Sequence, residues 1–319
     1  MNHRSLATLL IALAAPLGAA FAQAPRPHTL TLRVDNDAFN FWAMPWDRPD
    51  GEYTSGVHIT YDGARSPWWA RGLFGAGVAC TTGARECVGG SSEIGQDIYT
   101  PSLRASDPVP SADARPSAGW LYVSQSARWL SAPRSDELTI TLGVTGQPSL
   151  ARFTQRLAHS AAPEFNRPVD WSRQIGFEPG AIVRYDQRRR LAAFRGFDMV
   201  SALGASVGNV TTAAEAGLKT RIGWNLRHPW LPEDGPTELA IVAGASGQAV
   251  ARDIFLDGNT FSSSARVGHR PFVGSGELGI TLRHRALTLA YRTVATSRTY
   301  DGGPRWHPWS SMVAGVTLP

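Results

Sequence analysis

The sequence contains few cysteines, no long apolar run beyond its start, and no tract of basic residues. Only Cys80 and Cys87 occur in 319 residues, and no further Cys or His accompanies them at ligand spacing, so a zinc site or thiol catalysis has no support. After residue 22, no segment provides the roughly 18 consecutive apolar residues of a membrane-spanning helix. The formal net charge of +5 is spread along the chain, so binding to nucleic acid is not indicated.

Two common signatures of hydrolases are also absent. No Gly-x-Ser-x-Gly elbow occurs, which leaves a serine hydrolase of that type without support. No His-Glu-x-x-His occurs, which does the same for the zinc mechanism that uses this motif. Any hydrolytic chemistry must therefore depend on other residues.

The first residues have the composition of a targeting segment. A positive start at Arg4 is followed by an apolar run from Leu6 to Ala20, and Ala20-Phe-Ala22 matches the small-x-small rule for cleavage. We expect a signal peptide over residues 1–22, with the mature domain spanning 23–319. In an oxidising compartment, two cysteines of one Gly- and Thr-rich loop favour pairing, so we expect a disulfide between Cys80 and Cys87.

Short stretches of alternating apolar and polar residues dominate the rest of the chain. Such alternation is typical of strands with one apolar and one polar face. Twelve strands are expected, near residues 29–37, 54–63, 92–100, 118–131, 135–145, 174–186, 195–206, 212–225, 237–249, 273–284, 286–298 and 308–318.

The polar face of these strands carries charged residues as well as Gly, Ser and Thr. The charged or titratable members are Arg33, His58, Arg128, Lys219, Arg221, Glu277 and Arg283. In a soluble sandwich these groups would face water, whereas in an outer-membrane barrel they would line the lumen. Periodicity alone does not separate the two architectures.

Three features favour the membrane barrel. Strands of about 9–11 residues have the length that a tilted membrane strand needs. The export signal agrees with this location, although the chain ends in Pro319 where many such barrels end in Phe. Aromatic residues near strand ends are typical of a girdle at the membrane interface: Tyr61, Trp120, Trp129, Trp224 and Trp309. We expect an all-β protein of the bacterial outer membrane, a twelve-stranded antiparallel transmembrane β-barrel with both chain ends on the periplasmic side.

Residues 149–159 break the strand pattern and predict a short helix in an extracellular loop, with Ser149 as its N-cap. Helical spacing separates an apolar face from a polar face. The first consists of Leu150, Phe153 and Leu157, and the second of Arg152, Gln155 and His159.

Polar residues at the tip of the first expected hairpin raise the possibility of a metal site. Asn36 and Asp37 end one strand, Thr54 begins the next, and period two places Asp37 and Thr54 on the lumen side. Carboxylate, amide and hydroxyl oxygens are ligands that suit calcium, and the connection adds Asp47, Asp50 and Glu52. The alternative is an ordinary polar strand end followed by a turn.

His159 is the natural candidate for a general base, because an imidazole can take a proton from water near neutral pH. A single histidine on a loop helix can equally be a solvated residue without a role. The residues alone leave both alternatives open.

An ordered set of motifs resembles the outer-membrane lipid A 3′-O-deacylases over nearly the whole chain from Leu30 onward. The motifs are Val34-Asp-Asn-Asp37, Tyr53-Thr-Ser-Gly56, Ile94-Gly-Gln-Asp-Ile-Tyr-Thr-Pro101, Ala118-Gly-Trp120, Gly143-Val-Thr-Gly146 followed by Gln155 and His159, Trp171-Ser-Arg-Gln174 with Glu178, and Asp253-Ile-Phe-Leu-Asp-Gly-Asn259. Each motif is weak singly, and their order along the chain makes the set specific.

The resemblance implies a calcium-dependent esterase that removes the 3′-linked acyl or acyloxyacyl chain of lipid A in the outer leaflet. Carried over by motif, the site lies between the barrel wall and the loop helix. It consists of His159 as catalytic base, with Asn36, Asp37 and Thr54 as catalytic groups that hold Ca²⁺, and with Gln155 as a substrate contact. Partners would be lipopolysaccharide and outer-membrane lipids, and we expect a monomer.

One departure affects substrate recognition. Some relatives have a lysine where Ser106 stands, and Arg104 is the basic residue that can replace it as a contact to a substrate phosphate. Two alternatives remain: a phospholipase-type acyl hydrolase with the same chemistry, and a non-catalytic barrel that serves as a pore or structural protein. A pore requires a wide lumen. Twelve strands with charged side chains inside favour a lumen that is filled by those side chains.

Overall fold

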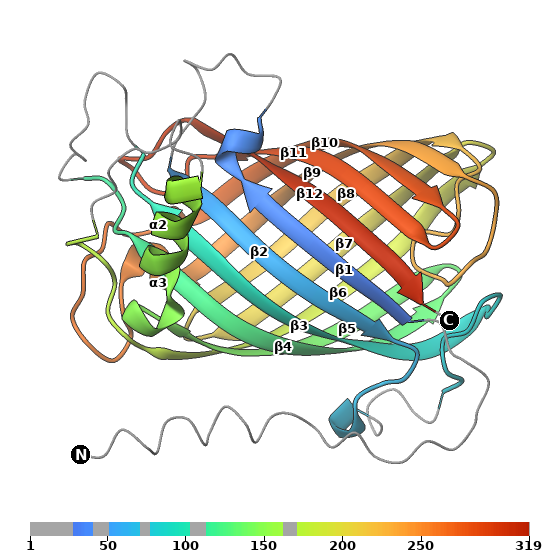
Figure 1. Ribbon diagram of the computed structural model, residues 1–319, viewed down its shortest axis with the longest axis horizontal. Coiled ribbons are helices and arrows are strands. Elements are labelled where there is room, and N and C mark those ends of the chain that lie inside the picture. Colours follow the sequence, from blue (N-terminus) through green and yellow to red (C-terminus); the bar gives the residue numbers. More distant parts are fainter. Residues whose placement is uncertain (1–27, 41–50, 71–76, 103–112, 162–170, 319) are drawn as a thin grey trace.

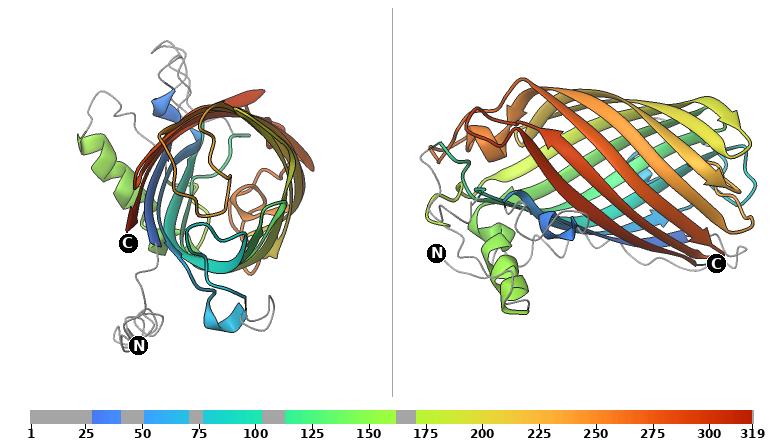
Figure 2. Two further views of the ribbon diagram at one scale, coloured as in Figure 1. Left: turned by 90° about the vertical axis from the view of Figure 1, so that its right-hand side faces the viewer. Right: turned by 90° about the horizontal axis from the view of Figure 1, so that it is seen from above.

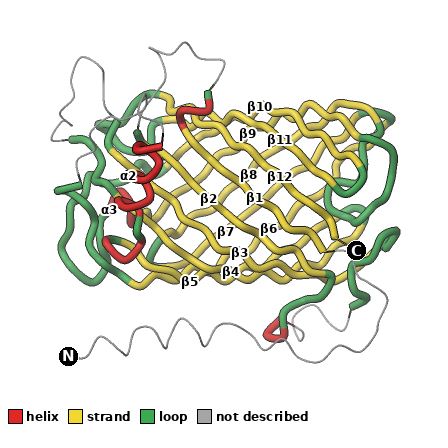
Figure 3. Tube along the Cα trace, viewed as in Figure 1, coloured by secondary structure: helices red, strands yellow, loops and turns green. Residues whose placement is uncertain are grey.

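Twelve antiparallel strands form a closed barrel in the computed structural model (Figure 1). The structure describes residues 28–40, 51–70, 77–102, 113–161 and 171–318, so the expected signal peptide lies outside the described residues. Each strand pairs with its sequence neighbours, and β1 pairs with β12 to close the wall of strands (Figure 3), which confirms the predicted number and order. The strands are β1 (His28–Asn36), β2 (Glu52–Gly63), β3 (Glu86–Thr100), β4 (Ala118–Ser131), β5 (Arg134–Thr145), β6 (Pro179–Phe194), β7 (Phe197–Gly208), β8 (Thr211–Trp224), β9 (Glu238–Asp253), β10 (Phe272–His284), β11 (Leu287–Ser297) and β12 (Trp306–Leu318).

Several strands are longer than the predicted 9–11 residues, and β6 and β9 reach 16 residues. The prediction for β6, residues 174–186, was wrong at both ends. Its second half continues past the expected end with a register shift between Arg190 and Ala192. Such a shift interrupts the strict alternation on which the prediction relied.

The two faces of the wall have opposite chemistry. Apolar side chains such as Leu32 and Ile59 are exposed on the outside, while charged side chains on the inside pair with one another. Examples are Lys219 with Glu277, 2.5 Å apart, and Arg184 with Asp186, 2.7 Å apart. This is the arrangement of an outer-membrane barrel. Among the described residues, no helix has the length and apolar character needed to cross a membrane.

Two of the five aromatic residues assigned to the interface girdle point inward instead. Trp120 is 3% exposed and stacks on Tyr122 within the lumen. Trp309 packs edge-on against Tyr53 and borders a cavity lined by lumenal charges. The girdle prediction was wrong for both, because position near a strand end does not tell which face a side chain occupies.

The lumen is filled at its outer end, defined as the end where β1 leads into β2. The short helix α3 (Ile254–Asp257) lies within the outline of the barrel (Figure 2). Its Phe255 stacks on Tyr99 at 4.5 Å, in a cluster with the buried Trp120 and Ile175. Apolar packing therefore takes the place of an open mouth.

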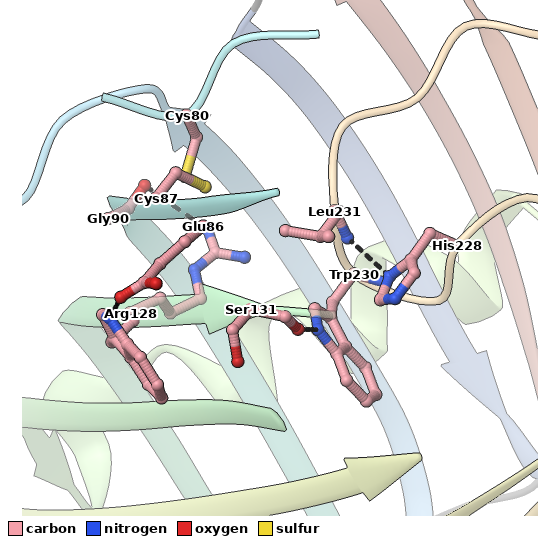
Figure 4. The surroundings of a disulfide bond; sticks show 10 residues. Cys80, Glu86, Cys87, Gly90, Arg128, Ser131, His228, Trp230 and Leu231 are labelled. Atoms are coloured by element: carbon pink, nitrogen blue, oxygen red, sulfur yellow. Dashed lines mark hydrogen bonds between the residues drawn. A yellow bond between two sulfur atoms is a disulfide. The ribbon is translucent and has the colours of Figure 1, made fainter. Parts of the chain in front are cut away.

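At the inner end, the connection between β8 and β9 reaches across to β4 (Figure 4). The Trp230 indole donates to the Ser131 carbonyl at 2.6 Å, and Leu231 packs against the disulfide formed by Cys80 and Cys87. The predicted disulfide is thus confirmed. Between the two ends the lumen holds cavities of about 390 and 520 Å³ lined by paired charges, which agrees with a filled barrel better than with a pore.

Candidate active site

The β1–β2 connection begins with a short turn of helix, η1 (Asp37–Phe39), rather than with more strand. Asn36 caps this turn, and its side-chain oxygen accepts a hydrogen bond from the Ala38 amide at 2.7 Å. Asn36 also occupies the last paired position of β1, opposite Ser55. Because the adjacent Asp35 faces the lumen, alternation places Asn36 on the outer face of the wall.

Asn40 fastens η1 to the wall at the outer end of β12. Its amide donates to the carbonyls of Asp37 and Pro308, at 2.7 and 3.0 Å, and its oxygen accepts from the Ser310 hydroxyl. Tyr291 adds a bond from its hydroxyl to the Phe39 carbonyl. These bonds give the Asn36-Asp37 pair a fixed place on the outer rim.

The Asp37 carboxylate is 3% exposed and accepts a hydrogen bond from the Gly51 amide at 2.8 Å. Gly51 has a φ of +127°, and a β-carbon there would lie 2.5 Å from the Pro101 carbonyl oxygen. Only glycine is therefore compatible with this backbone position. The contact ties Asp37 to the start of β2.

The prediction that strand alternation places Asp37 and Thr54 on the lumen side was wrong. Asp37 lies in η1, outside the strand. Thr54 lies at a β-bulge, where the pairing of β2 with β3 passes from Tyr53 directly to Ser55. Its hydroxyl bonds that of Thr100 at 2.6 Å. Thr100 follows the lumenal Tyr99, so the pair lies away from the lumen.

Helix α2 (Ala151–Ala161) lies against the outside of the barrel wall at the outer end (Figure 2). Gly119 of β4 makes this possible, because a β-carbon there would come within 2.3 Å of the Ala151 side chain. Ile98 of β3 and Trp171 complete the buried contact with Ala151. The helix begins beside β4 and runs across β3 toward β2 and η1 (Figure 1).

The predicted helix is confirmed, but its start is not where the capping rule placed it. Ser149 ends a preceding turn, η4 (Gln147–Ser149), and its hydroxyl donates to the Gly146 carbonyl. Leu150 follows with a φ of +60°, and α2 starts only at Ala151. Ser149 also receives a bond at its carbonyl from the Gln96 side chain, at 2.6 Å, so its role is to attach the loop to β3.

The polar residues of α2 have different environments. Gln155 is 6% exposed, and its oxygen accepts from the Trp171 indole at 2.9 Å, while its side-chain nitrogen has no partner among the described residues. His159 is half-buried in the last turn, and within the described part of the chain its imidazole makes no hydrogen bond or ion pair. The His159 imidazole is thus available to a bound molecule, whereas the Gln155 nitrogen is unpaired but buried.

Asn36, Asp37 and Thr54 lie where β1 leads into β2, because Asn36 pairs with Ser55, the residue after Thr54. The structure also places Gln155 and His159 on a helix at the same end of the barrel. Arg104, Asp47 and Asp50 lie outside the described residues. Glu52 is not available as a metal ligand, because its buried carboxylate accepts hydrogen bonds from Tyr300 and Ser102.

Glu178 fastens the outer loops to one another. Its carboxylate accepts from the Thr260 amide at 2.6 Å and from the Asn209 side chain at 2.7 Å. Burial acts to raise the pKa of Glu178, but the hydrogen bonds from Thr260 and Asn209 outweigh it and hold the pKa below the usual range of a glutamate. A charged carboxylate therefore organises this rim.

Sequence reasoning missed three supporting residues: Gln96, Thr100 and Trp171. Gln96 and Thr100 lie within the motif Ile94–Pro101, and Trp171 begins another motif. Pairing β2 against β3 would have placed Thr100 beside the start of β2. No local sequence pattern predicted the contact between Trp171 and Gln155, because it joins a helix to a distant loop residue.

Comparison with known proteins agrees with the barrel fold. The family model described as outer membrane protein LpxR matches residues 6–318. LpxR from Salmonella typhimurium has a similar structure, with a TM-score of 0.72 and 16% identity over 90% of this chain and 99% of that chain.

The β domain of the Bordetella autotransporter BrkA also matches, with a TM-score of 0.46 and 11% identity over 92% of this chain and 98% of that chain. No curated protein sequence matches the chain. The family match confirms the expected outer-membrane location and supports a lipid A deacylase. The chain belongs to the LpxR family of outer-membrane proteins, the lipid A deacylase family that its motifs resemble.

Proposed function

We propose that this protein is a calcium-dependent lipid A 3′-O-deacylase that acts in the outer leaflet of the outer membrane. The observation that carries the proposal is the position of α2 on the outside of the wall, beside the ends of β3 and β4. There His159 is on the lipid side of the wall rather than in the lumen, and Gln155 is buried between the helix and the wall. Family membership supplies the substrate class, and the 3′ position follows the resemblance of the motifs.

The reaction is the hydrolysis of an ester by water. His159 takes a proton from the water as its oxygen attacks the acyl carbonyl carbon. The bond between that carbon and the sugar oxygen then breaks, and the imidazolium returns its proton to the sugar oxygen. The products are a free hydroxyl on the sugar and a fatty acid.

Gln155 is suited to orient the substrate from the wall side of α2. Its side-chain nitrogen is buried without a partner among the described residues, and an unpaired buried donor is costly unless a bound group accepts from it. A carbonyl oxygen of the substrate is such a group. Trp171 fixes which atom of the Gln155 amide remains unpaired, because its indole donates to the oxygen and leaves the nitrogen as the free donor.

Calcium suits the chemistry of the rim. Asn36, Asp37 and Thr54 offer amide, carboxylate and hydroxyl oxygens, and the half-buried Asn36 keeps a second lone pair beside its capping bond. Among the described residues, no group of three His, Cys, Asp or Glu side chains is arranged to hold a metal. The proposed site therefore depends on neutral oxygens as well as Asp37. Calcium held there would stabilise negative charge on the carbonyl oxygen.

Mass spectrometry of lipid A and phospholipids from cells that express the protein tests the proposal. The expected result is lipid A lighter by one acyl unit, with phospholipids unchanged. Loss of acyl chains from phospholipids alone would favour the phospholipase alternative. Unchanged lipids of both kinds, with folded protein verified in the outer membrane, would favour the non-catalytic barrel.

A further inference from the structure

Helix α2 has two faces with clear partners. Ala151 and Gln155, one turn apart, are buried against the barrel wall. On the opposite side Phe153 and Leu157 are 65% and 59% exposed, and Leu150 before the helix is 54% exposed. A helix on the outside of a membrane barrel places such an apolar face among lipid chains.

The flank between these faces is basic. At 100° per residue, Arg152, Arg156 and His159 lie within an arc of about 60° on one flank. Both arginines are exposed. Within the described residues neither forms an ion pair, so no carboxylate of the described wall competes for their charge.

Energetics fixes the direction in which this flank faces. A guanidinium is costly to hold at the bilayer centre, so arginines near the boundary extend toward the headgroups. The basic flank therefore faces the polar surface of the membrane, with His159 on the same side. Planar guanidinium groups bind phosphate oxygens through paired hydrogen bonds.

We propose that Arg152 and Arg156 recognise a phosphate next to the scissile ester, and so select phosphorylated lipid A. The inference rests on the proposed function and extends it to the headgroup. In lipid A the 3′ ester and the 4′ phosphate are on neighbouring carbons of one sugar ring. Arg156 and His159 are three residues apart and therefore adjacent on the helix surface. A phosphate held by the arginines thus brings the neighbouring ester to the imidazole.

The test compares two substrates and three proteins in phosphatidylcholine vesicles. The substrates are lipid A with its 4′ phosphate and the same lipid without it. The proteins are the unaltered chain, the double variant R152Q/R156Q, and the control R195Q, which removes an exposed arginine from the β6–β7 turn at the inner end. Initial rates at several lipid concentrations give KM and kcat for each pair.

The unaltered chain and R195Q are expected to prefer the phosphorylated lipid by about tenfold or more in kcat/KM, the size of a lost charge-assisted contact. In R152Q/R156Q this preference should fall to near one, through a higher KM, while the rate on the dephosphorylated lipid stays the same. A preference that survives in the double variant would overturn the inference, as would equal rates of the unaltered chain on both lipids.

A general attraction to anionic membranes is a separate outcome. If R152Q/R156Q slows hydrolysis of both lipids equally, and only when phosphatidylglycerol is added to the vesicles, the arginines bind the membrane surface and the proposed selectivity is wrong. Failure of the folded, unaltered chain to hydrolyse either lipid would instead reject the proposed function, and this inference with it.

Discussion

The inside and the outside of the barrel wall use polar residues in different ways. Inside, charged groups compensate one another, as in the pairing of Lys219 and Arg292 with Glu277. Outside, at the outer rim, the Gln155 nitrogen and the His159 imidazole have no partner within the described residues. Paired charges stabilise a closed lumen, whereas available donors and acceptors serve a ligand. This contrast favours the proposed site on the lipid-facing surface over one inside the lumen.

The largest expected effect belongs to the outer side. His159→Ala should lower the rate of lipid A hydrolysis by about 10²- to 10⁴-fold, because it removes the general base. Acyl release from lipid A measures the rate, and resistance of the barrel to unfolding by detergent at room temperature checks assembly. An active His159→Ala variant would remove His159 from the mechanism.

Loss of Asp37 should change the response to calcium as well as the rate. Asp37→Ala is expected to need at least about tenfold more calcium for half-maximal activity, because the carboxylate is the charged member of the proposed ligand set. Titration with calcium after treatment with a chelator gives this value. An unchanged midpoint together with full activity would exclude Asp37 as a ligand.

A smaller effect is expected from the residue that orients Gln155. Trp171→Phe keeps an aromatic ring but removes the indole N–H and its hydrogen bond, worth about 1 kcal/mol, which corresponds to a loss of about fivefold in kcat/KM. Trp69→Phe is the control, because the Trp69 indole donates to Gln125 near the middle of β4, also at 2.9 Å and away from α2. Equal effects of the two changes would contradict a positioning role for Trp171.

The hydrogen bonds that Glu178 accepts from Thr260 and Asn209 should respond to pH, although these residues take no direct part in the reaction. The pKa of Glu178 is lowered in the folded protein, so its stabilising contribution is present above the pKa of the unfolded chain and is lost as pH falls through the folded pKa. The protection factors of the Thr260 and Phe261 amides, which compare the observed exchange rate with the intrinsic rate at the same pH, should therefore fall as the pH is lowered through the folded pKa. Glu178→Gln should show low protection factors at every pH. Unchanged protection in this variant would argue against Glu178 as a fastening of the loops.

The smallest effect should come from the lumen. Lys219→Met combined with Glu277→Gln removes a partly exposed ion pair, and such pairs contribute about 0–1 kcal/mol. Activity on lipid A should stay within about twofold of the unaltered chain. A large loss of activity with an intact barrel would mean that the lumen participates, and would break the distinction between the two sides.

Periodicity predicted the barrel well because the rule it depends on is local. Alternation of residues such as Leu30, Leu32 and Val34 specifies one lipid-facing surface, and twelve such segments specify the closed sheet. The far end of β6 was mispredicted because a register shift near Leu191 breaks the alternation. Side-chain direction at Trp120 and Thr54 was mispredicted because filling of the lumen and a bulge act beyond the local pattern.

The candidate site was accessible from sequence only in part. The motifs selected Asn36, Asp37, Thr54, Gln155 and His159, and the structure places all five at the outer end of the barrel. Their support was not accessible, since the contacts Asp37–Gly51, Thr54–Thr100 and Gln155–Trp171 join positions far apart in the chain. Sequence motifs therefore identify the candidate site residues more readily than they identify the residues that position them.

The most direct test of the account is hydrolysis of lipid A in water enriched in ¹⁸O, followed by mass spectrometry of both products. Attack of an activated water on the acyl carbonyl predicts a released fatty acid that carries ¹⁸O, and a sugar hydroxyl that carries none. A deacylated sugar without a labelled fatty acid, with the acyl chain found on another lipid, would show transfer instead of hydrolysis and would contradict the proposed mechanism.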